Sequence, residues 1–240
     1  MSMETMYAER YNLKPAAAWL RGHAIKTGAP EIDPELLEMP LEVLTDDELS
    51  AIVEVGETTG QKLYPFKTGK SELPRVRQVL GFLHGTEFET LLDVGSGRGV
   101  FLLPFMEEFP RVQVTSLDLL DKRVDFLNEL SAGGYSQLTA YNKNICDQPF
   151  AENSFDVVTL LEVLEHIPEV DKAVAAAVKM ARKYVVVSVP SKEDDNPEHI
   201  HLLTKDILTD LFARVGCTKL HFGGVNGHLI LVANVEGSHK

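Results

Sequence analysis

The 240-residue sequence contains only two cysteines, Cys146 and Cys217, and neither lies in a CxxC pair. Their number and spacing exclude a disulfide framework and a cysteine-based zinc site. There is also no run of about 18 apolar residues, so no segment is predicted to cross a bilayer. The opening residues MSMETMYAERYNLK lack the apolar segment of a secretory signal, and we therefore expect a cytoplasmic protein.

Positive charge is scarce as well. The 23 Lys and Arg residues against 36 Asp and Glu residues give a formal net charge of −13. Because nucleic-acid-binding proteins usually present a basic face, we do not expect a nucleic acid partner. Binding to an anionic membrane surface is disfavoured for the same reason. The composition is otherwise that of an ordinary globular protein, and it does not determine an oligomeric state.

Two patterns follow one another along the chain. Residues 1–85 are mostly helical in pattern, with a capping box at 45–48, and we expect them to form an N-terminal extension that acts as a lid. Residues 86–240 alternate short apolar runs with helical segments, which predicts a doubly wound, mostly parallel, seven-stranded α/β sheet of Rossmann-like type. Strands are expected at 90–95, 112–118, 138–142, 155–163 and 184–190, with a terminal hairpin around Asn226-Gly227.

The sharpest motif lies after the first of these strands and reads Asp93-Val94-Gly95-Ser96-Gly97-Arg98-Gly99. Glycines there permit positive φ and let the backbone approach a ligand closely. Dinucleotide-binding turns have the spacing GxGxxG and hold a pyrophosphate, whereas this turn is GxGxG and has an acid before it. The Asp93 carboxylate would repel a pyrophosphate, so the motif favours a ligand with an ammonium group.

This motif resembles the first motif of the class I S-adenosylmethionine-dependent methyltransferases (type 11/12), which has the form Asp-x-Gly-x-Gly-x-Gly. The resemblance covers roughly residues 85–235. It implies a methyltransferase domain over 86–240 with S-adenosylmethionine as cofactor. It also implies that Asp93 and the turn formed by Gly95, Ser96 and Gly97 hold the methionine part.

Further residues match the family in the correct order. Asp118 ends the second strand, where a carboxylate can accept both ribose hydroxyl protons. The resemblance implies that Leu119 packs on the adenine and that Leu161 lines the pocket. The segment beginning Asn144-Ile145 matches the place where the family uses an acid to bind the adenine amino group; the Asn144 carbonyl oxygen can accept the same proton.

Acids and histidines follow the fourth and fifth strands. Glu162, Glu165 and His166 form an E-x-x-E-H cluster, and His199 comes after the fifth strand. Because ligands bind at the carboxyl ends of strands in open α/β sheets, these residues are expected near the substrate. His166 and Glu162 are the candidate general bases.

The same four residues, Glu162, Glu165, His166 and His199, are similar to the metal-binding set of the small-RNA 3′-terminal 2′-O-methyltransferases. They could hold a divalent cation. However, the cluster is also common in small-molecule methyltransferases without a metal, and we do not expect a metal to be bound.

One stretch, residues 62–77, is locally basic and carries Lys67, Lys70 and Arg75 beside Tyr64 and Phe66. We interpret it as a lid segment that grips an anionic part of the substrate, or the carboxylate of the cofactor.

These patterns leave several functions open. We expect a methyltransferase that acts on a small-molecule substrate. The alternatives are a metal-assisted RNA ribose 2′-O-methyltransferase and a nonenzymatic cofactor-binding partner subunit. A nicotinamide-dependent dehydrogenase is disfavoured by the GxGxG spacing.

Overall fold

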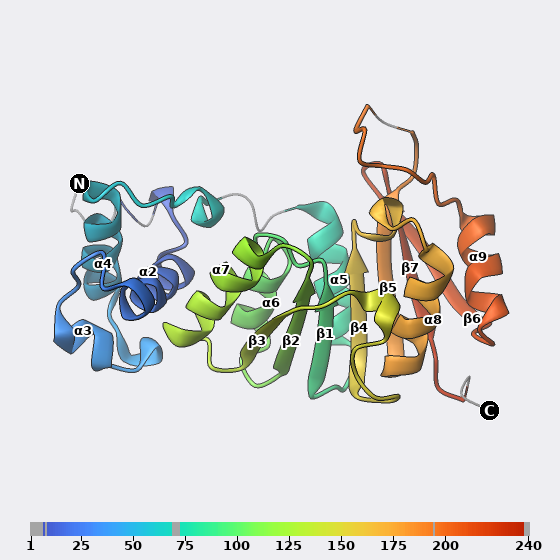
Figure 1. Cartoon of the computed structure of the whole chain (residues 1–240), viewed down its shortest axis with the longest axis horizontal. Coiled ribbons are helices and arrows are strands. Elements are labelled where there is room, and N and C mark those ends of the chain that lie inside the picture. The colour runs from blue at the N-terminus through green and yellow to red at the C-terminus, as the bar shows by residue number, and fades with distance from the viewer. Residues whose placement is uncertain (1–6, 8, 69–72, 194, 238–240) are drawn as a thin grey trace. The chain divides into compact units, whose positions relative to one another are not determined.

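The computed structural model describes residues 7, 9–68, 73–193 and 195–237, and it contains two compact units (Figure 1). One unit spans Met1–Glu72, Gly97–Pro110 and Leu120–Ala140; the other spans Leu73–Ser96, Arg111–Leu119 and Tyr141–Lys240. The main helices are α2 (Leu13–Thr27), α3 (Pro34–Glu38), α4 (Asp46–Thr58), α5 (Pro74–His84), α6 (Leu102–Glu108), α7 (Asp121–Ala132), α8 (Val170–Met180) and α9 (Lys205–Arg214).

The sheet confirms the predicted seven-stranded, mostly parallel architecture. Its strand order is β3-β2-β1-β4-β5-β7-β6. β1 runs parallel to β2 and β4, and β4 runs parallel to β5, whereas β7 is antiparallel to both β5 and β6. No described helix is long and apolar enough to cross a membrane. The strands are β1 (Thr90–Val94), β2 (Gln113–Asp118), β3 (Leu138–Asn142), β4 (Phe155–Leu161), β5 (Ala181–Pro190), β6 (Lys219–Val225) and β7 (His228–Asn234).

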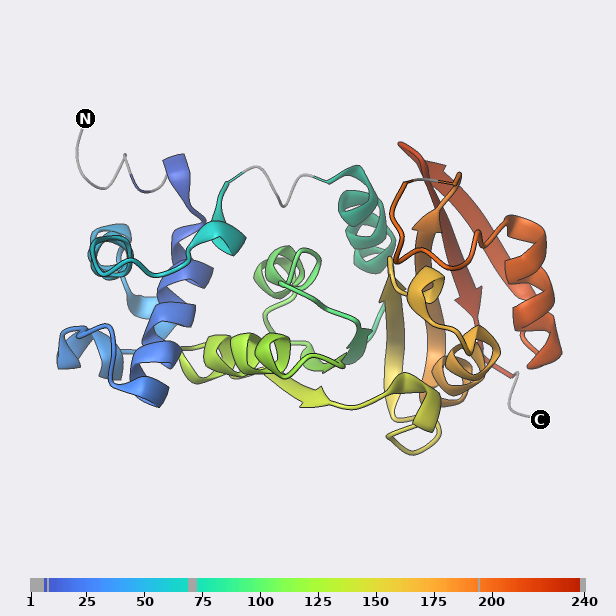
Figure 2. The ribbon, with the colours of Figure 1, turned by 45° about the horizontal axis from the view of Figure 1, so that its top comes forward.

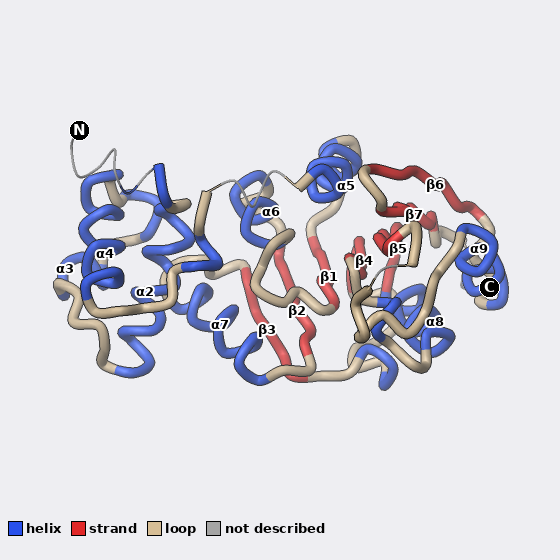
Figure 3. The backbone as a smooth tube through the Cα atoms, turned by 90° about the horizontal axis from the view of Figure 1, so that it is seen from above, coloured by secondary structure: helices blue, strands red, loops and turns tan. Residues whose placement is uncertain are grey.

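The core of the second unit lies on the central strands. β4 is buried at six consecutive positions, as expected of a parallel strand that is covered on both faces. In Figure 3, α5 lies on one side of these strands and α8 on the other. α8 is rich in alanine, and Ala173, Ala177 and Val178 are buried against the sheet. The small side chains let the helix pack closely on the strands.

The first unit is built around α2, which packs against both α4 and α7 and appears in blue in Figure 2. α4 begins with the predicted capping box, in which the Glu48 backbone N–H donates to the Thr45 side chain and the Thr45 N–H donates to the Glu48 carboxylate. In α2, Trp19 is buried, and its Nε1 donates a hydrogen bond of 2.8 Å to Oε2 of Glu129 in α7.

One element boundary differs from the expectation. The sequence predicts a helix over 170–183 with basic residues in its last turn, but α8 ends at Met180 and Ala181 begins β5. Arg182 and Lys183 are therefore strand residues. The local pattern favoured a helix end because cations stabilise it, whereas the tertiary structure uses these two cations to hold a buried acid.

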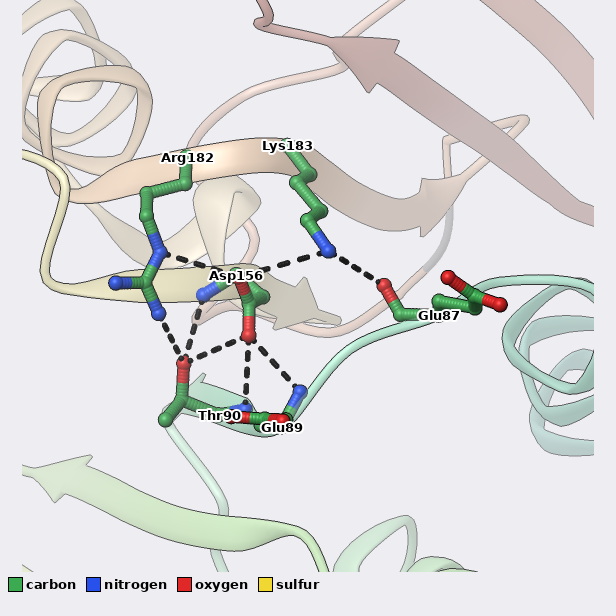
Figure 4. A network of polar contacts seen from close by, with 6 residues as sticks. All are labelled: Glu87, Glu89, Thr90, Asp156, Arg182 and Lys183. Atoms are coloured by element: carbon green, nitrogen blue, oxygen red, sulfur yellow. Dashed lines mark hydrogen bonds and ion pairs between the residues drawn. The ribbon is translucent and has the colours of Figure 1, made fainter.

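That acid is Asp156 at the start of β4 (Figure 4). It is 6% exposed, and its Oδ2 accepts from the backbone N–H groups of Glu89 and Thr90 at 2.9 and 3.2 Å. Its Oδ1 accepts from Nε of Arg182 at 3.1 Å and lies 3.8 Å from Nζ of Lys183. Burial by itself raises the pKa of Asp156, but the Glu89 N–H and the Arg182 guanidinium outweigh it and hold that pKa below its ordinary value.

Replacing Asp156 with alanine is expected to lower the free energy of unfolding at pH 7 by about 3 kcal/mol, because two backbone donors and a cation lose their acceptor. A carboxyl group with a lowered pKa contributes stability above its ordinary pKa of 3.8 and loses it as the pH falls through the lowered value. The difference in the free energy of unfolding between the wild type and Asp156→Ala should therefore become smaller at low pH.

Urea unfolding at several pH values measures this effect. Asp171→Ala is the matched control, because the Asp171–Arg214 pair, at 3.5 Å, is exposed on both sides. Its loss is expected to cost less than about 0.5 kcal/mol. Equal losses in the two variants would contradict the role given to Asp156.

Candidate functional site

The glycine turn follows β1 and adopts backbone conformations that side chains disfavour. Gly95, Gly97 and Gly99 have φ values of 68°, 59° and 73°. The Gly95 N–H donates to the carbonyl of Leu117 at 2.7 Å, which ties the turn to the end of β2. A Cβ at Gly95 would lie 2.6 Å from Cγ2 of Val163, so the turn also touches the segment after β4. Glycine is needed here both for positive φ and for this close approach.

Asp93 lies just before the turn and is 2% exposed. Its Oδ1 accepts a hydrogen bond of 2.6 Å from the hydroxyl of Thr159 in β4. Burial raises the pKa of Asp93 to about 6; the hydrogen bonds from Ser96 and Thr159 oppose this rise, and the charge of Asp118 adds to it. The charged group that acts on Asp93 is a second acid, Asp118, so this buried carboxyl group is suited to receive a cation.

Asp118 ends β2 and is 5% exposed. The Asp93↔Ser116 register places it two residues beyond the position opposite Asp93, and its charge acts on the Asp93 carboxyl. Ser116 and Ser96 share a hydrogen bond of 2.6 Å between their hydroxyl groups. Leu119 follows with 62% of its surface exposed, so a large apolar side chain is available to a planar ligand. The two acids and this leucine thus gather at one edge of the sheet.

Asn144 and its neighbours form a tight local turn. The Asn144 side-chain oxygen accepts from the Cys146 backbone N–H at 2.9 Å and caps a short 3₁₀ helix at Ile145–Asp147. The oxygen expected to bind the adenine amino group is therefore already engaged by the backbone, although a carbonyl oxygen has two lone pairs. Ile145 is buried, and Leu161 is half-buried at the end of β4. The cofactor contacts of these three residues stay predictions.

Glu162 is held away from the other acids of its cluster. It has a positive φ of 59°, which is strained for a side chain of this size. Its Oε1 accepts from the Ser188 hydroxyl at 2.7 Å, and its Oε2 lies 3.0 Å from Nδ1 of His228. His228 is not among the site residues expected from the sequence. The signal in the sequence that could have indicated it is its position directly after the Asn-Gly turn of the hairpin.

The other three residues of the predicted metal set do come together. Ligand atoms of Glu165, His166 and His199 lie within 4.8 Å of one another, and Glu165 is fully buried. Nδ1 of His166 lies 2.9 Å from the carbonyl oxygen of Glu198, which leaves Nε2 to face the cluster. These donors suit a divalent cation, but Glu162 does not belong to this group. The expectation that no metal is bound here stays a prediction.

The predicted lid segment is described only in part, since Lys70 lies outside the described residues. Tyr64 is 57% exposed, with Nζ of Lys67 and Cζ of Arg98 each 6.0 Å from its ring centroid. Arg98 belongs to the glycine turn. An exposed aromatic ring between two cations is an arrangement that can bind a nucleobase or a phosphate.

Known proteins share this arrangement of sequence and fold. Residues 92–187 match the model of a family described as a methyltransferase domain. A ribosomal RNA small subunit methyltransferase G from Exiguobacterium sp. is 39% identical over 79 residues, which is 31% of this chain and 33% of that relative. The chain thus spans about a third of the length of this curated relative.

Solved structures match over more of the chain. A SAM-dependent methyltransferase from Aquifex aeolicus has a TM-score of 0.54 at 19% identity, covering 67% of this chain and 89% of its own. Magnesium protoporphyrin IX methyltransferase from Synechocystis PCC 6803 with bound SAH has a TM-score of 0.55 at 16% identity, covering 68% and 83%. At these identities, the two structures establish the fold.

The relatives correct one expectation. We did not expect a nucleic acid partner, yet curated relatives that match this chain are named for ribosomal RNA. The expectation was based on the net charge of −13, which averages over the whole surface. A local cationic group such as Lys67 and Arg98 around Tyr64 is compatible with an acidic total.

The family match and the sheet topology agree with the motifs at Asp93 and Asp118, whereas the likeness to small-RNA methyltransferases at the metal motif finds no support among these relatives. Residues 92–187 of this chain therefore match a methyltransferase domain, and the sheet has the Rossmann-like fold of the methyltransferases of known structure.

Proposed function

We propose that this protein binds S-adenosylmethionine and transfers its methyl group to an acceptor. One observation supports this most strongly: a buried carboxylate at the end of β1 precedes a glycine turn, and a second one ends the neighbouring strand β2. The first suits the ammonium of the cofactor, and the second suits its ribose hydroxyls.

The protein contributes to the reaction mainly by positioning the acceptor and the cofactor. When bound, the cofactor supplies a methyl group that its sulfonium already activates. The chain has to hold the acceptor atom in line with that methyl group and keep water out. The apolar Leu119 and the buried residues around the turn serve these ends.

For the acceptor, the curated relative favours ribosomal RNA. The cations of Lys67 and Arg98 beside the exposed Tyr64 ring support the same acceptor class, because phosphates and bases bind such groups. A small-molecule acceptor is the alternative, and the two are separated by one assay.

Calorimetric titration tests the cofactor. We expect S-adenosylmethionine and S-adenosylhomocysteine to bind and NAD not to bind, because Asp93 disfavours a pyrophosphate. Asp118→Ala should weaken both sulfur nucleosides, since the ribose hydroxyls lose their acceptor. Binding of NAD alone would overturn the proposal.

Transfer of labelled methyl groups tests the acceptor. Purified protein is incubated with small-subunit ribosomal RNA in one series and with a panel of phenols, catechols and amines in the other. We expect labelled RNA, and RNA binding that weakens with salt. Label in a small molecule alone would favour the alternative, and cofactor binding without any transfer would favour a nonenzymatic partner subunit.

A further inference from the structure

Two residues from different strands, Ser188 and His228, meet at Glu162. Ser188 of β5 is fully buried and donates its hydroxyl proton to Oε1 of Glu162 at 2.7 Å. The backbone N–H of Glu162 donates to the Ser188 carbonyl at 2.9 Å. These two bonds hold both the backbone and the carboxylate of Glu162 against Ser188, and the second carboxylate oxygen lies 3.0 Å from Nδ1 of His228.

The two nitrogens of His228 differ in their surroundings. Nδ1 is buried and lies 3.0 Å from Oε2 of Glu162, an ion-pair distance, without forming a hydrogen bond among the described residues; the side chain as a whole is 25% exposed. A proton on Nδ1 that is directed at the carboxylate leaves the lone pair on Nε2, where it can accept a proton.

The sheet topology brings this histidine to the cofactor edge. β7 is antiparallel, so its first residue, His228, pairs with Pro190 at the last residue of β5. On the other side, Glu162 follows the end of β4, and its neighbour Val163 packs directly on Gly95 of the glycine turn. The Glu162–His228 pair therefore lies at the carboxyl ends of the parallel strands, where acceptors bind in open α/β sheets.

We propose that His228 is the general base of the transfer reaction and that Glu162 is a positioning residue that acts through it. This inference rests on the function proposed above. It also specifies the acceptor class, because a base is needed only when the attacking oxygen or nitrogen carries a proton.

The lone pair of the acceptor hydroxyl or amine forms the new bond to the methyl carbon. The carbon–sulfur bond breaks, and its electron pair stays on sulfur, which leaves S-adenosylhomocysteine. The acceptor proton moves to Nε2 of His228, and the positive charge of the resulting imidazolium faces Glu162.

This assignment differs from the sequence expectation that His166 or Glu162 acts as the base. The Glu162 carboxylate is engaged on both oxygens. His166 belongs instead to the cluster with Glu165 and His199, and its Nδ1 lies 2.9 Å from the carbonyl oxygen of Glu198. His228 is the candidate outside that cluster that combines a partly exposed side chain with a carboxylate beside its Nδ1.

The test compares His228→Ala and Glu162→Gln with His221→Ala, an exposed histidine of the same hairpin, using the acceptor that the wild-type protein methylates. In single-turnover assays we expect His228→Ala to be about 100-fold slower, with unchanged affinity for S-adenosylmethionine. Added imidazole should restore part of the lost rate to His228→Ala only. Glu162→Gln should be about 10-fold slower, and ¹⁵N NMR should show that His228 no longer keeps its proton on Nδ1.

The outcomes separate the two proposals. A wild-type protein that binds no cofactor or transfers no methyl group overturns the proposed function and this inference with it. A wild-type protein that transfers methyl groups, together with a His228→Ala variant of wild-type rate, overturns the general base alone. So does a loss of rate that imidazole does not rescue and that thermal melting traces to unfolding.

Discussion

Asp93→Asn is expected to lower the affinity for S-adenosylmethionine by about 100-fold. The variant keeps the size of the side chain and an oxygen that can accept from the Thr159 hydroxyl. It removes the negative charge that the ammonium of the cofactor needs in a buried site. Calorimetric titration of both proteins at pH 7.5 measures the difference.

The same carboxyl group gives cofactor binding a pH dependence. Burial raises the pKa of Asp93 to about 6, so below that pH the free protein holds a neutral acid that cannot pair with a cation. Affinity in the wild type should fall roughly tenfold for each pH unit below about 6 and level off above it. Asp93→Asn should show no such dependence. A wild-type affinity that is flat between pH 5 and 7 would contradict the role of Asp93.

The stability of the cofactor-free protein changes with pH in the direction opposite to that of cofactor affinity. A carboxyl group whose pKa is raised from 3.8 to about 6 stabilises the fold at low pH, and this contribution is lost as the pH rises through 6. The ionised Asp93 therefore destabilises the protein without cofactor at pH 7, by up to about 3 kcal/mol. Asp93→Asn should melt at a higher temperature than the wild type, whereas the exposed control Asp206→Asn should change neither melting nor binding.

Gly133→Ala is expected to lower the free energy of unfolding by about 3 kcal/mol or more. The sequence alone does not predict this loss of stability, since a glycine that follows a helix is normally needed because its backbone adopts the left-handed conformation. Gly133 has φ −88°, which alanine adopts easily. The effect comes from space: a Cβ there would lie 1.7 Å from the carbonyl oxygen of Ala18 in α2.

The contact between α2 and α7 is thus backbone against backbone. A Cβ at Gly22 would likewise lie 1.7 Å from the carbonyl oxygen of Glu129. Neither carbonyl can move aside as a flexible side chain could, so the helices would have to separate. Trp19 is the single tryptophan of the chain and is bonded to Glu129 across this contact, so its fluorescence reports on the separation directly.

Gly81→Ala serves as the matched control. Gly81 lies inside α5, and a Cβ there would have no neighbour within 4 Å. Alanine is the better helix former, so this variant should gain up to about 1 kcal/mol. Denaturant unfolding followed by tryptophan fluorescence compares the two. If Gly133→Ala were as stable as the wild type, the close packing of α2 on α7 would be wrong.

Much of the fold could be predicted because its signals are local. The buried runs of β1 and β4, the Asn226-Gly227 turn and the capping box at Thr45 each depend on neighbouring residues. The helix over 170–183 was too long because the sequence shows that Arg182 and Lys183 are basic but not that Asp156 faces them. The prediction that there is no nucleic acid partner was wrong for a similar reason, since a net charge does not show where on the surface the cations lie.

By itself, the sequence determined the class of fold and the position of the two acids at the carboxyl ends of neighbouring strands, since strand periodicity and the Asp93 to Gly99 motif are properties of short segments. Only the tertiary structure decided which side chains meet. The antiparallel β7 brings His228 to Glu162, Glu165 joins the two histidines without Glu162, and α2 touches α7 through bare backbone. Such contacts between distant residues depend on the order and direction of the strands and on the distance between helix axes. The packing of the whole chain sets these quantities, and a single segment does not contain them.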